Sequence, residues 1–128
     1  MTEVSQPTHN RLISVLKAIG PYLREEKCEL DYYFFDCLAV CVDDEKSPEK
    51  REFWGWWLQL EKQEQNFIAN YQFGLYDDKG KWRDVAIPAA AKVEVEKTLE
   101  TFHQKLDSVL SEQYQFAISS HAESAKEL

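Results

Sequence analysis

The first apolar pattern along the chain repeats every three or four residues. Between residues 9 and 19, one helical stripe carries Leu12, Ile13, Leu16 and Ile19. Gly20 and Pro21 follow directly, and this pair ends a helix because glycine frees the backbone and proline cannot continue the helical hydrogen bonds. The pattern therefore predicts a short amphipathic helix over residues 9–19.

The pattern then changes to the alternation of a strand. Residues 30–42, LDYYFFDCLAVCV, are aromatic and β-branched, and both faces are largely apolar, which predicts a strand that is central or covered on both faces. Asp36 is the exception. Because a buried carboxylate needs partners, a hydrogen-bonded or edge-exposed Asp36 is favoured over a catalytic one. Residues 43–52 carry eight charges in ten positions and predict an exposed loop with a turn at Pro48.

Further strands follow this loop. Residues 53–62 form an aromatic strand, and residues 66–76 alternate cleanly enough to predict a strand with one wet face. Residues 77–80, DDKG, predict a hairpin turn in which Gly80 takes a positive φ. A short fourth strand is expected over residues 81–87, ending at Pro88.

Helical spacing returns over residues 92–114. The apolar stripe there comprises Val93, Val95, Leu99, Phe102, Leu106, Val109 and Leu110. A coiled coil is an alternative, but about three heptads in a domain whose sheet needs a cover favour packing on the sheet. Residues 1–8 and the small, polar residues 117–128 are expected to fray.

The order of helix, four strands and helix, with short links between the strands, predicts an α+β fold. We expect a four-stranded antiparallel sheet, connected as a meander, with an N-terminal and a C-terminal helix packed on it. The 128 residues suffice for one domain, which we expect to span residues 1–128.

Composition narrows the classes of function. The chain has 15 basic and 23 acidic residues, a formal charge of −8, so a phosphate backbone repels it and direct DNA or RNA binding is not expected. No apolar run approaches the ~18–20 residues of a membrane span, and the N-terminus lacks the pattern of a signal peptide. We therefore expect a cytoplasmic monomer that does not bind membranes.

The cysteines and histidines do not indicate catalysis. An odd set of three cysteines, Cys28, Cys37 and Cys41, does not fit a disulfide framework. Cys37 and Cys41 have a spacing seen in metal sites, but four residues of a strand span about 13 Å, too far for one ion or one bridge. The sequence has no phosphate loop, dinucleotide fingerprint or HExxH motif, and none of its three histidines, His9, His103 and His121, sits with a Cys, Ser or Asp in a recognisable nucleophile setting. We expect no metal, no cofactor and no enzymatic activity.

The stretch REFWGWW, residues 51–57, holds three of the four tryptophans. Strict alternation assigns to the better core face Trp54, Trp56, Leu58 and Leu60. It assigns to the other face Phe53, Gly55, Trp57 and Gln59. Gly55 indicates a bulge or a close approach of another backbone. A charged loop that leads through an arginine into aromatic residues has the composition of a protein-binding hot spot.

Several stretches together resemble the Crl family, the sigma factor-binding proteins of enteric bacteria. They are Gly20-Pro21-Tyr22, Cys28, FFDCLAVCV at 34–42, REFWGWW at 51–57, YQFGL at 71–75 and Trp82. REFWGWW is a rare string, so this part of the resemblance is specific. The similarity covers about residues 10–88 and weakens beyond them to a shared helical pattern around FHQKL.

The resemblance implies a transcriptional activator that does not bind DNA by itself. Proteins of this family bind domain 2 of the stationary-phase sigma factor and promote its assembly with core RNA polymerase, which raises the expression of stationary-phase genes, including those for curli fibres. The resemblance implies a partner-binding set of Tyr22, Arg24, Arg51, Phe53, Trp56 and Trp82.

This set places Trp56 at the surface, whereas strict alternation places it inside. A bulge at Gly55 would reconcile the two, and we follow the resemblance, which leaves Trp54 and Trp57 to the fold. The alternative hypothesis is a small-ligand-binding α+β domain whose aromatic residues line a pocket. Binding to a sigma factor without any small molecule would favour the sigma factor-binding hypothesis over the ligand-binding hypothesis.

Overall fold

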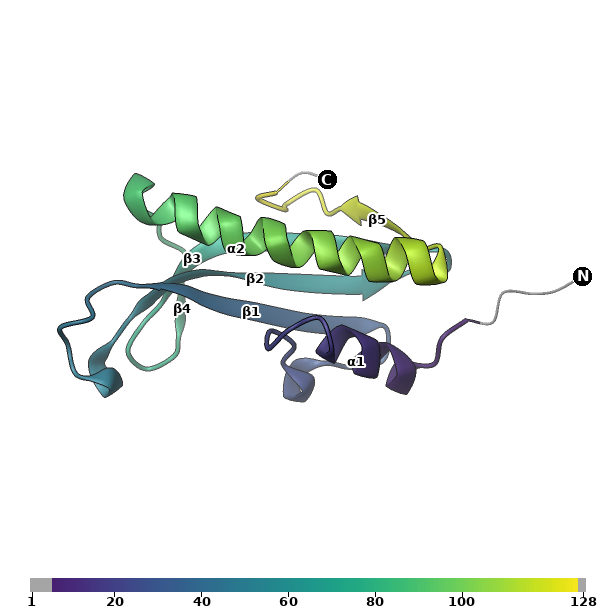
Figure 1. The fold of residues 1–128 in the computed structure, drawn as a ribbon, viewed down its shortest axis with the longest axis horizontal. Coiled ribbons are helices and arrows are strands. Elements are labelled where there is room, and N and C mark those ends of the chain that lie inside the picture. Colours follow the sequence, from purple (N-terminus) through teal and green to yellow (C-terminus); the bar gives the residue numbers. More distant parts are fainter. Residues whose placement is uncertain (1–5, 127–128) are drawn as a thin grey trace, which may run out of the picture.

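The computed structural model describes residues 6–126 and combines two α-helices with one β-sheet (Figure 1). The helices are α1 (His9–Lys17) and α2 (Ala89–Asp107), and α2 continues into a π-helical turn, Ser108–Gln113. The strands are β1 (Tyr32–Cys41), β2 (Phe53–Lys62), β3 (Asn66–Tyr76), β4 (Trp82–Arg83) and β5 (Ala117–Ser120). The predicted bounds of β2 and β3 are confirmed.

The sheet is mixed, so the prediction of a purely antiparallel sheet is wrong. Strands β1 to β4 are antiparallel neighbours in chain order, but β5 pairs with β3 in parallel. Strand β1 lies at the end of this order, so the first of the two alternatives predicted for it, a central position or cover on both faces, is wrong. Its outer edge is partly covered by residues 22–24, since the Arg24 N–H donates to the Phe34 carbonyl over 2.9 Å.

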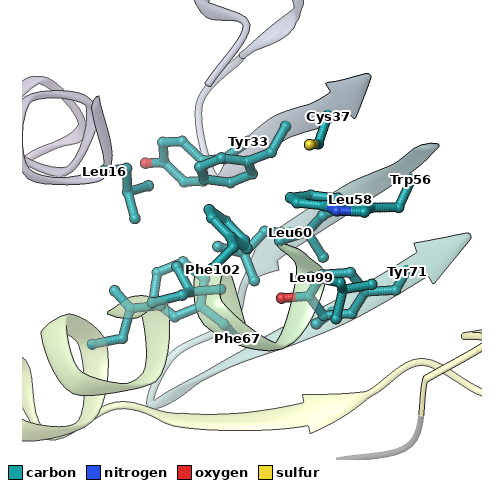
Figure 2. Close-up of a cluster of buried hydrophobic side chains, with 14 of the residues drawn as sticks. Leu16, Tyr33, Cys37, Trp56, Leu58, Leu60, Phe67, Tyr71, Leu99 and Phe102 are labelled. Atoms are coloured by element: carbon teal, nitrogen blue, oxygen red, sulfur yellow. The ribbon is translucent and has the colours of Figure 1, made fainter. Parts of the chain in front are cut away.

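The core joins one face of the sheet to both helices (Figure 2). From the strands it takes Tyr33, Phe35, Cys37, Trp56, Leu58, Leu60, Phe67, Ala69 and Tyr71. From the helical segments it takes Leu12, Leu16, Val95, Leu99, Phe102, Leu106 and Leu110. These positions follow a spacing of two in the strands and of three or four in the helices, as the sequence predicts. Each large apolar side chain buried in this way stabilises the fold by roughly 1.5–3 kcal/mol.

The C-terminal segment does not fray over residues 117–126. After strand β5, the His121 and Ala125 N–H groups donate to the Ala69 and Tyr71 carbonyls over 2.9 and 2.8 Å. Small, polar residues predicted fraying, but the backbone of β3 offers unpaired hydrogen-bonding groups that this segment satisfies. Of the segments expected to fray, 1–8 and 117–128, residues 1–5 and 127–128 lie outside the described residues.

The fourth strand is shorter than predicted. It comprises only Trp82–Arg83, whereas the sequence predicted a strand over residues 81–87, and Val85 is 46% exposed. The preceding turn is as predicted, because Gly80 has a φ of 74°. Helix α2 begins directly after Pro88, three residues earlier than the pattern indicated.

Candidate protein-binding surface

The face of the sheet opposite the core carries a row of aromatic rings, which we call the outer aromatic cluster: Phe34, Trp57, Tyr76 and Trp82. Trp57 is the centre of the row. Its ring centroid lies 6.0 Å from that of Phe34 in a stacked arrangement, and 6.0 Å from that of Trp82 at a steep angle. The Tyr76 ring packs against Trp82 at 5.0 Å. Phe34, Trp57 and Trp82 are partly exposed, so their rings are available to another molecule.

Gly74 holds the Trp82 indole close to the sheet. A Cβ atom at Gly74 would come within 2.5 Å of the Trp82 ring, closer than any side chain can tolerate. The absence of a side chain at Gly74 thus leaves the space that the Trp82 ring occupies. This close approach explains how a two-residue strand can hold a large ring in a fixed place.

A buried carboxylate links this cluster to Arg24. Asp36 is 5% exposed, and one of its oxygens accepts a hydrogen bond from Arg24 Nε over 2.6 Å. Its other oxygen accepts one from the Tyr76 hydroxyl over 2.9 Å. Of the two structural alternatives predicted for Asp36, the structure shows the hydrogen-bonded one and not the edge-exposed one. Burial, reinforced by the Asp36 charge, raises the pKa of Tyr76, so its hydroxyl stays protonated and donates.

Arg51 organises the charged loop in which it lies. Its Nε donates to the Lys46 carbonyl and its Nη2 to the Asp44 carbonyl, each over 2.9 Å. These two bonds fix the Arg51 side chain. Arg51 remains partly exposed, and a guanidinium has five N–H donors, so donors are left for a partner.

Phe53 lies on the same face as the outer aromatic cluster, as strict alternation predicts. It pairs with Cys41 on one side and with Tyr76 on the other, and its ring is partly exposed. Through Tyr76, the structure brings three of the predicted residues to one face: Arg24, Phe53 and Trp82.

The surface placement of Trp56 is wrong. Trp56 is 0% exposed, and its ring packs against Tyr22, Tyr71 and Phe102 at 5.7, 6.0 and 5.0 Å. Its indole N–H donates to the Thr98 hydroxyl over 3.1 Å. Strict alternation was therefore the better guide, and any part that Trp56 plays in binding a partner is indirect.

The bulge that would have turned Trp56 outward lies in the neighbouring strand. Leu38 pairs with Gly55 and Val40 with Trp54, so Ala39 is the extra residue and β1 contains the irregularity. A Cβ atom at Gly55 would lie 2.0 Å from the Cys37 carbonyl oxygen. Gly55 thus permits the close backbone approach that the sequence indicated, while β2 keeps its alternation.

Tyr22 lies beside the sheet edge rather than in the outer aromatic cluster. Its ring meets Phe102 edge-on at 5.5 Å and rests on Trp56, and it remains partly exposed. Burial raises the pKa of its hydroxyl above the usual value. Tyr22 is thus continuous with the core, and its backbone carbonyl accepts the Asp36 N–H over 3.0 Å.

Three members of the outer aromatic cluster were not among the predicted site residues: Phe34, Trp57 and Tyr76. The signal for Trp57 was present in the alternation of residues 53–59, which placed its ring outside. Tyr76 could not be found from local sequence, because its role depends on Asp36, forty residues away in the chain.

Two pockets bear on the alternative hypothesis of a ligand-binding domain. A pocket of about 620 Å³ is lined by no aromatic side chain, and its walls are Val15, Ala18, Ile19, Thr101, Gln104, Lys105, Ser108, Val109 and Gln113. A smaller pocket of about 350 Å³ adjoins the outer aromatic cluster and is lined by Trp57, Asn70, Gln72, Trp82, Asp84 and Glu123.

The cysteines and His103 are the remaining candidates for chemistry. All three cysteines, Cys28, Cys37 and Cys41, are free thiols. Across residues 6–126, no three His, Cys, Asp or Glu side chains gather closely enough to hold a metal ion. Within the same range, no helix has the length and apolar character needed to cross a membrane. His103 Nδ1 forms a hydrogen bond of 2.7 Å with the buried Tyr71 hydroxyl, and burial lowers the pKa of His103.

A partly exposed row of aromatic rings, linked to an ordered arginine, is typical of proteins that bind other proteins, since aromatic and arginine side chains are enriched at such interfaces. Comparison with known proteins then gives the family.

All of residues 1–128 match the family model described as "Sigma factor-binding transcriptional regulator Crl". A relative from Vibrio vulnificus (strain YJ016), "Sigma factor-binding protein Crl", is 52% identical over 127 residues, 98% of each chain. Relatives of the same name from Vibrio cholerae serotype O1 (strain ATCC 39541 / Classical Ogawa 395 / O395) and from Photobacterium profundum are 51% and 44% identical, over 98% and 95% of this chain and 98% and 92% of theirs. The chain therefore belongs to the Crl family of sigma factor-binding transcriptional regulators, and the resemblance stated from its motifs is confirmed.

Proposed function

We propose that this chain is a transcriptional activator that binds domain 2 of the stationary-phase sigma factor and promotes its assembly with core RNA polymerase. Family membership supports a sigma factor as the partner, since relatives that match nearly the whole chain are named for binding one. The observation that carries the proposal is the outer aromatic cluster, which Asp36 and Tyr76 link to Arg24, because exposed aromatic rings next to an ordered arginine are typical of protein interfaces.

Five of the six predicted residues are proposed to contact the partner directly: Tyr22, Arg24, Arg51, Phe53 and Trp82. All five are partly exposed. Trp56 is proposed to affect partner binding indirectly, because its buried ring packs against and supports the ring of Tyr22. The arginines supply planar donors for carboxylates, and the rings exclude water around them, which strengthens each charged contact.

The charge of the chain supports an indirect action on transcription. A formal charge of −8 opposes contact with DNA, so the proposed activator works through protein contacts as a cytoplasmic monomer. A mobility-shift assay with duplex DNA at physiological salt should show no complex without polymerase. A shift by the isolated chain would contradict this part of the proposal.

The central experiment is co-elution on gel filtration. The chain should co-elute with the purified stationary-phase sigma factor and with its isolated domain 2, but not with the housekeeping sigma factor. In a reconstituted assay it should increase transcription when sigma factor is limiting and lose this effect when holoenzyme is preassembled in excess. Failure to bind the stationary-phase sigma factor would refute the proposal.

A second candidate function is the binding of a small ligand. The pocket of about 350 Å³ beside Trp57 and Trp82 favours it, because this volume is within the usual range of ligand pockets, about 300–1,000 Å³. Purified chain that binds the sigma factor only after addition of a small-molecule extract would support this candidate over a plain adaptor.

A further inference from the structure

The buried carboxylate of Asp36 is fully used inside the protein. Arg24 Nε binds one oxygen and the Tyr76 hydroxyl binds the other, and the residue is 5% exposed. Asp36 therefore cannot contact a partner itself. Buried carboxylates are costly unless they are paired, so this arrangement carries a desolvation cost that Arg24 and Tyr76 offset.

Arg24 is held at three points and still faces solvent. Its Nε is fixed by Asp36, its Nη1 donates to the Pro21 carbonyl over 3.2 Å, and its backbone N–H donates to Phe34. Its Nη2 donates to no acceptor within residues 6–126. With 34% of the side chain exposed, the guanidinium presents its remaining N–H donors in a fixed direction.

The same carboxylate also reaches the outer aromatic cluster. Tyr76 donates to Asp36 and packs edge-on against Trp82, whose ring in turn contacts Trp57. Asp36 thus touches both Arg24, on the segment before β1, and Tyr76, at the end of β3. These parts of the chain are brought together only in the folded sheet.

We infer that Asp36, with Tyr76, is a positioning residue for partner binding: it fixes Arg24 and the Trp82 ring in the arrangement that the sigma factor recognises. Holding a long side chain in its bound conformation removes an ordering cost from association. This inference rests on the proposed function, because the partner is the one proposed there. It adds a residue that does not touch the partner but determines how two contact residues are presented.

The test is a cycle of variants measured for sigma-factor affinity and for melting. Asp36→Asn should weaken binding about tenfold, the scale expected for releasing one or two ordered side chains. In the Arg24→Ala background, Asp36→Asn should weaken binding by less than about threefold more, since most of its effect acts through Arg24. Tyr76→Phe keeps the ring on Trp82 and removes only the hydroxyl, so it should weaken binding less than Asp36→Asn does.

Asp77→Asn is the matched control. Asp77 is a second buried carboxylate that accepts from an arginine, Arg83 Nε over 3.1 Å, but it holds the turn after β3. It should lower the melting temperature without weakening sigma-factor binding. Equal weakening by Asp77→Asn and Asp36→Asn would show that affinity follows stability and would overturn the inference.

Two further outcomes separate the inference from the function. Normal binding by Asp36→Asn, or full additivity of Asp36→Asn with Arg24→Ala, would overturn the positioning role while leaving the proposed function intact. No binding by the wild-type chain would overturn the proposed function and the inference with it. If Asp36→Asn does not fold, the Tyr76→Phe variant tests the inference instead. Unchanged sigma-factor affinity in that variant would refute the positioning role of the hydrogen bond between Tyr76 and Asp36.

Discussion

The neighbouring residues Trp56 and Trp57 provide the sharpest test of which rings of strand β2 belong to the core and which lie on the proposed binding face. Trp56 is 0% exposed, has three aromatic neighbours and donates its indole N–H to Thr98. Replacing a ring in such a site by alanine costs about 3–5 kcal/mol, because the transfer energy is lost and a cavity remains. That is a large share of the ~5–15 kcal/mol that stabilise a typical domain.

Trp57 should behave differently, although it is the next residue and the same side chain. Its ring is partly exposed and lies on the outer face against Phe34 and Trp82. We expect Trp57→Ala to cost about 1–2 kcal/mol, within the common range for single substitutions. Its partner affinity should nevertheless fall by about tenfold or more, because the centre of the outer aromatic cluster is lost.

Thermal and urea unfolding measure the first effect, and titration of the folded variants with sigma factor measures the second. For a chain of this size, Trp56→Ala should lower the melting temperature by roughly 10–20 °C, and Trp57→Ala by clearly less. Affinities are compared below the lower melting temperature and corrected for the folded fraction. A Trp56→Ala variant with near-wild-type melting but no binding would refute the assignment of Trp56 to the core. It would favour the surface placement that the family resemblance implied.

Three further predictions concern other parts of the molecule. Arg51→Ala should weaken sigma-factor binding by roughly thirty- to several-thousand-fold, because truncating one side of a desolvated charge pair costs ~2–5 kcal/mol. The melting temperature of this variant should change little. Arg51→Lys should also bind less well, because lysine cannot copy the planar contact of arginine. Isothermal titration checks this, and wild-type affinity in a folded Arg51→Ala variant would show that Arg51 only holds its loop. Because burial and Lys126 lower the pKa of His103, the unfolded chain binds more protons near and below the ordinary histidine pKa of ~6.5, so stability should fall as the pH drops through this range. His103→Gln should flatten this dependence in urea unfolding between about pH 5 and 7.5, and an unchanged slope would contradict the assignment. Deleting residues 117–128 should speed amide exchange in β3 and lower the melting temperature relative to the full chain. Unchanged exchange in β3 would mean that β5 adds no stability.

Local patterns predicted most elements because they depend on spacing alone. The stripe of Leu12 and Leu16 identified α1, and the alternation of residues 53–76 identified β2 and β3 with the correct bounds. Errors arose where a segment depends on a distant neighbour. Strand β5 has a weak local preference and exists because the edge of β3 supplies hydrogen-bonding groups, which no pattern in residues 117–126 records.

The candidate site shows the same division. The resemblance named Arg51 and Phe53, whereas the residue pattern alone showed a charged loop that leads through an arginine into an aromatic strand. The alternation also predicted the face of the sheet on which each ring lies. Only the resemblance, which implied that Trp56 lies at the surface, gave the wrong face for Trp56. The burial of Trp56 follows from an uninterrupted β2, because the bulge is in β1.

The sequence by itself determined the class of elements, the acidic charge and the family, because each depends on residue type and local order. Only the tertiary structure decided what Asp36 does. A carboxylate in an apolar strand must find partners when it is buried, but which partners depends on the sheet that brings Arg24 and Tyr76 within hydrogen-bonding distance. The same sheet register places the Trp82 ring over Gly74 and beside Trp57. Contacts between residues far apart in the chain arise from packing, so local sequence could not predict them.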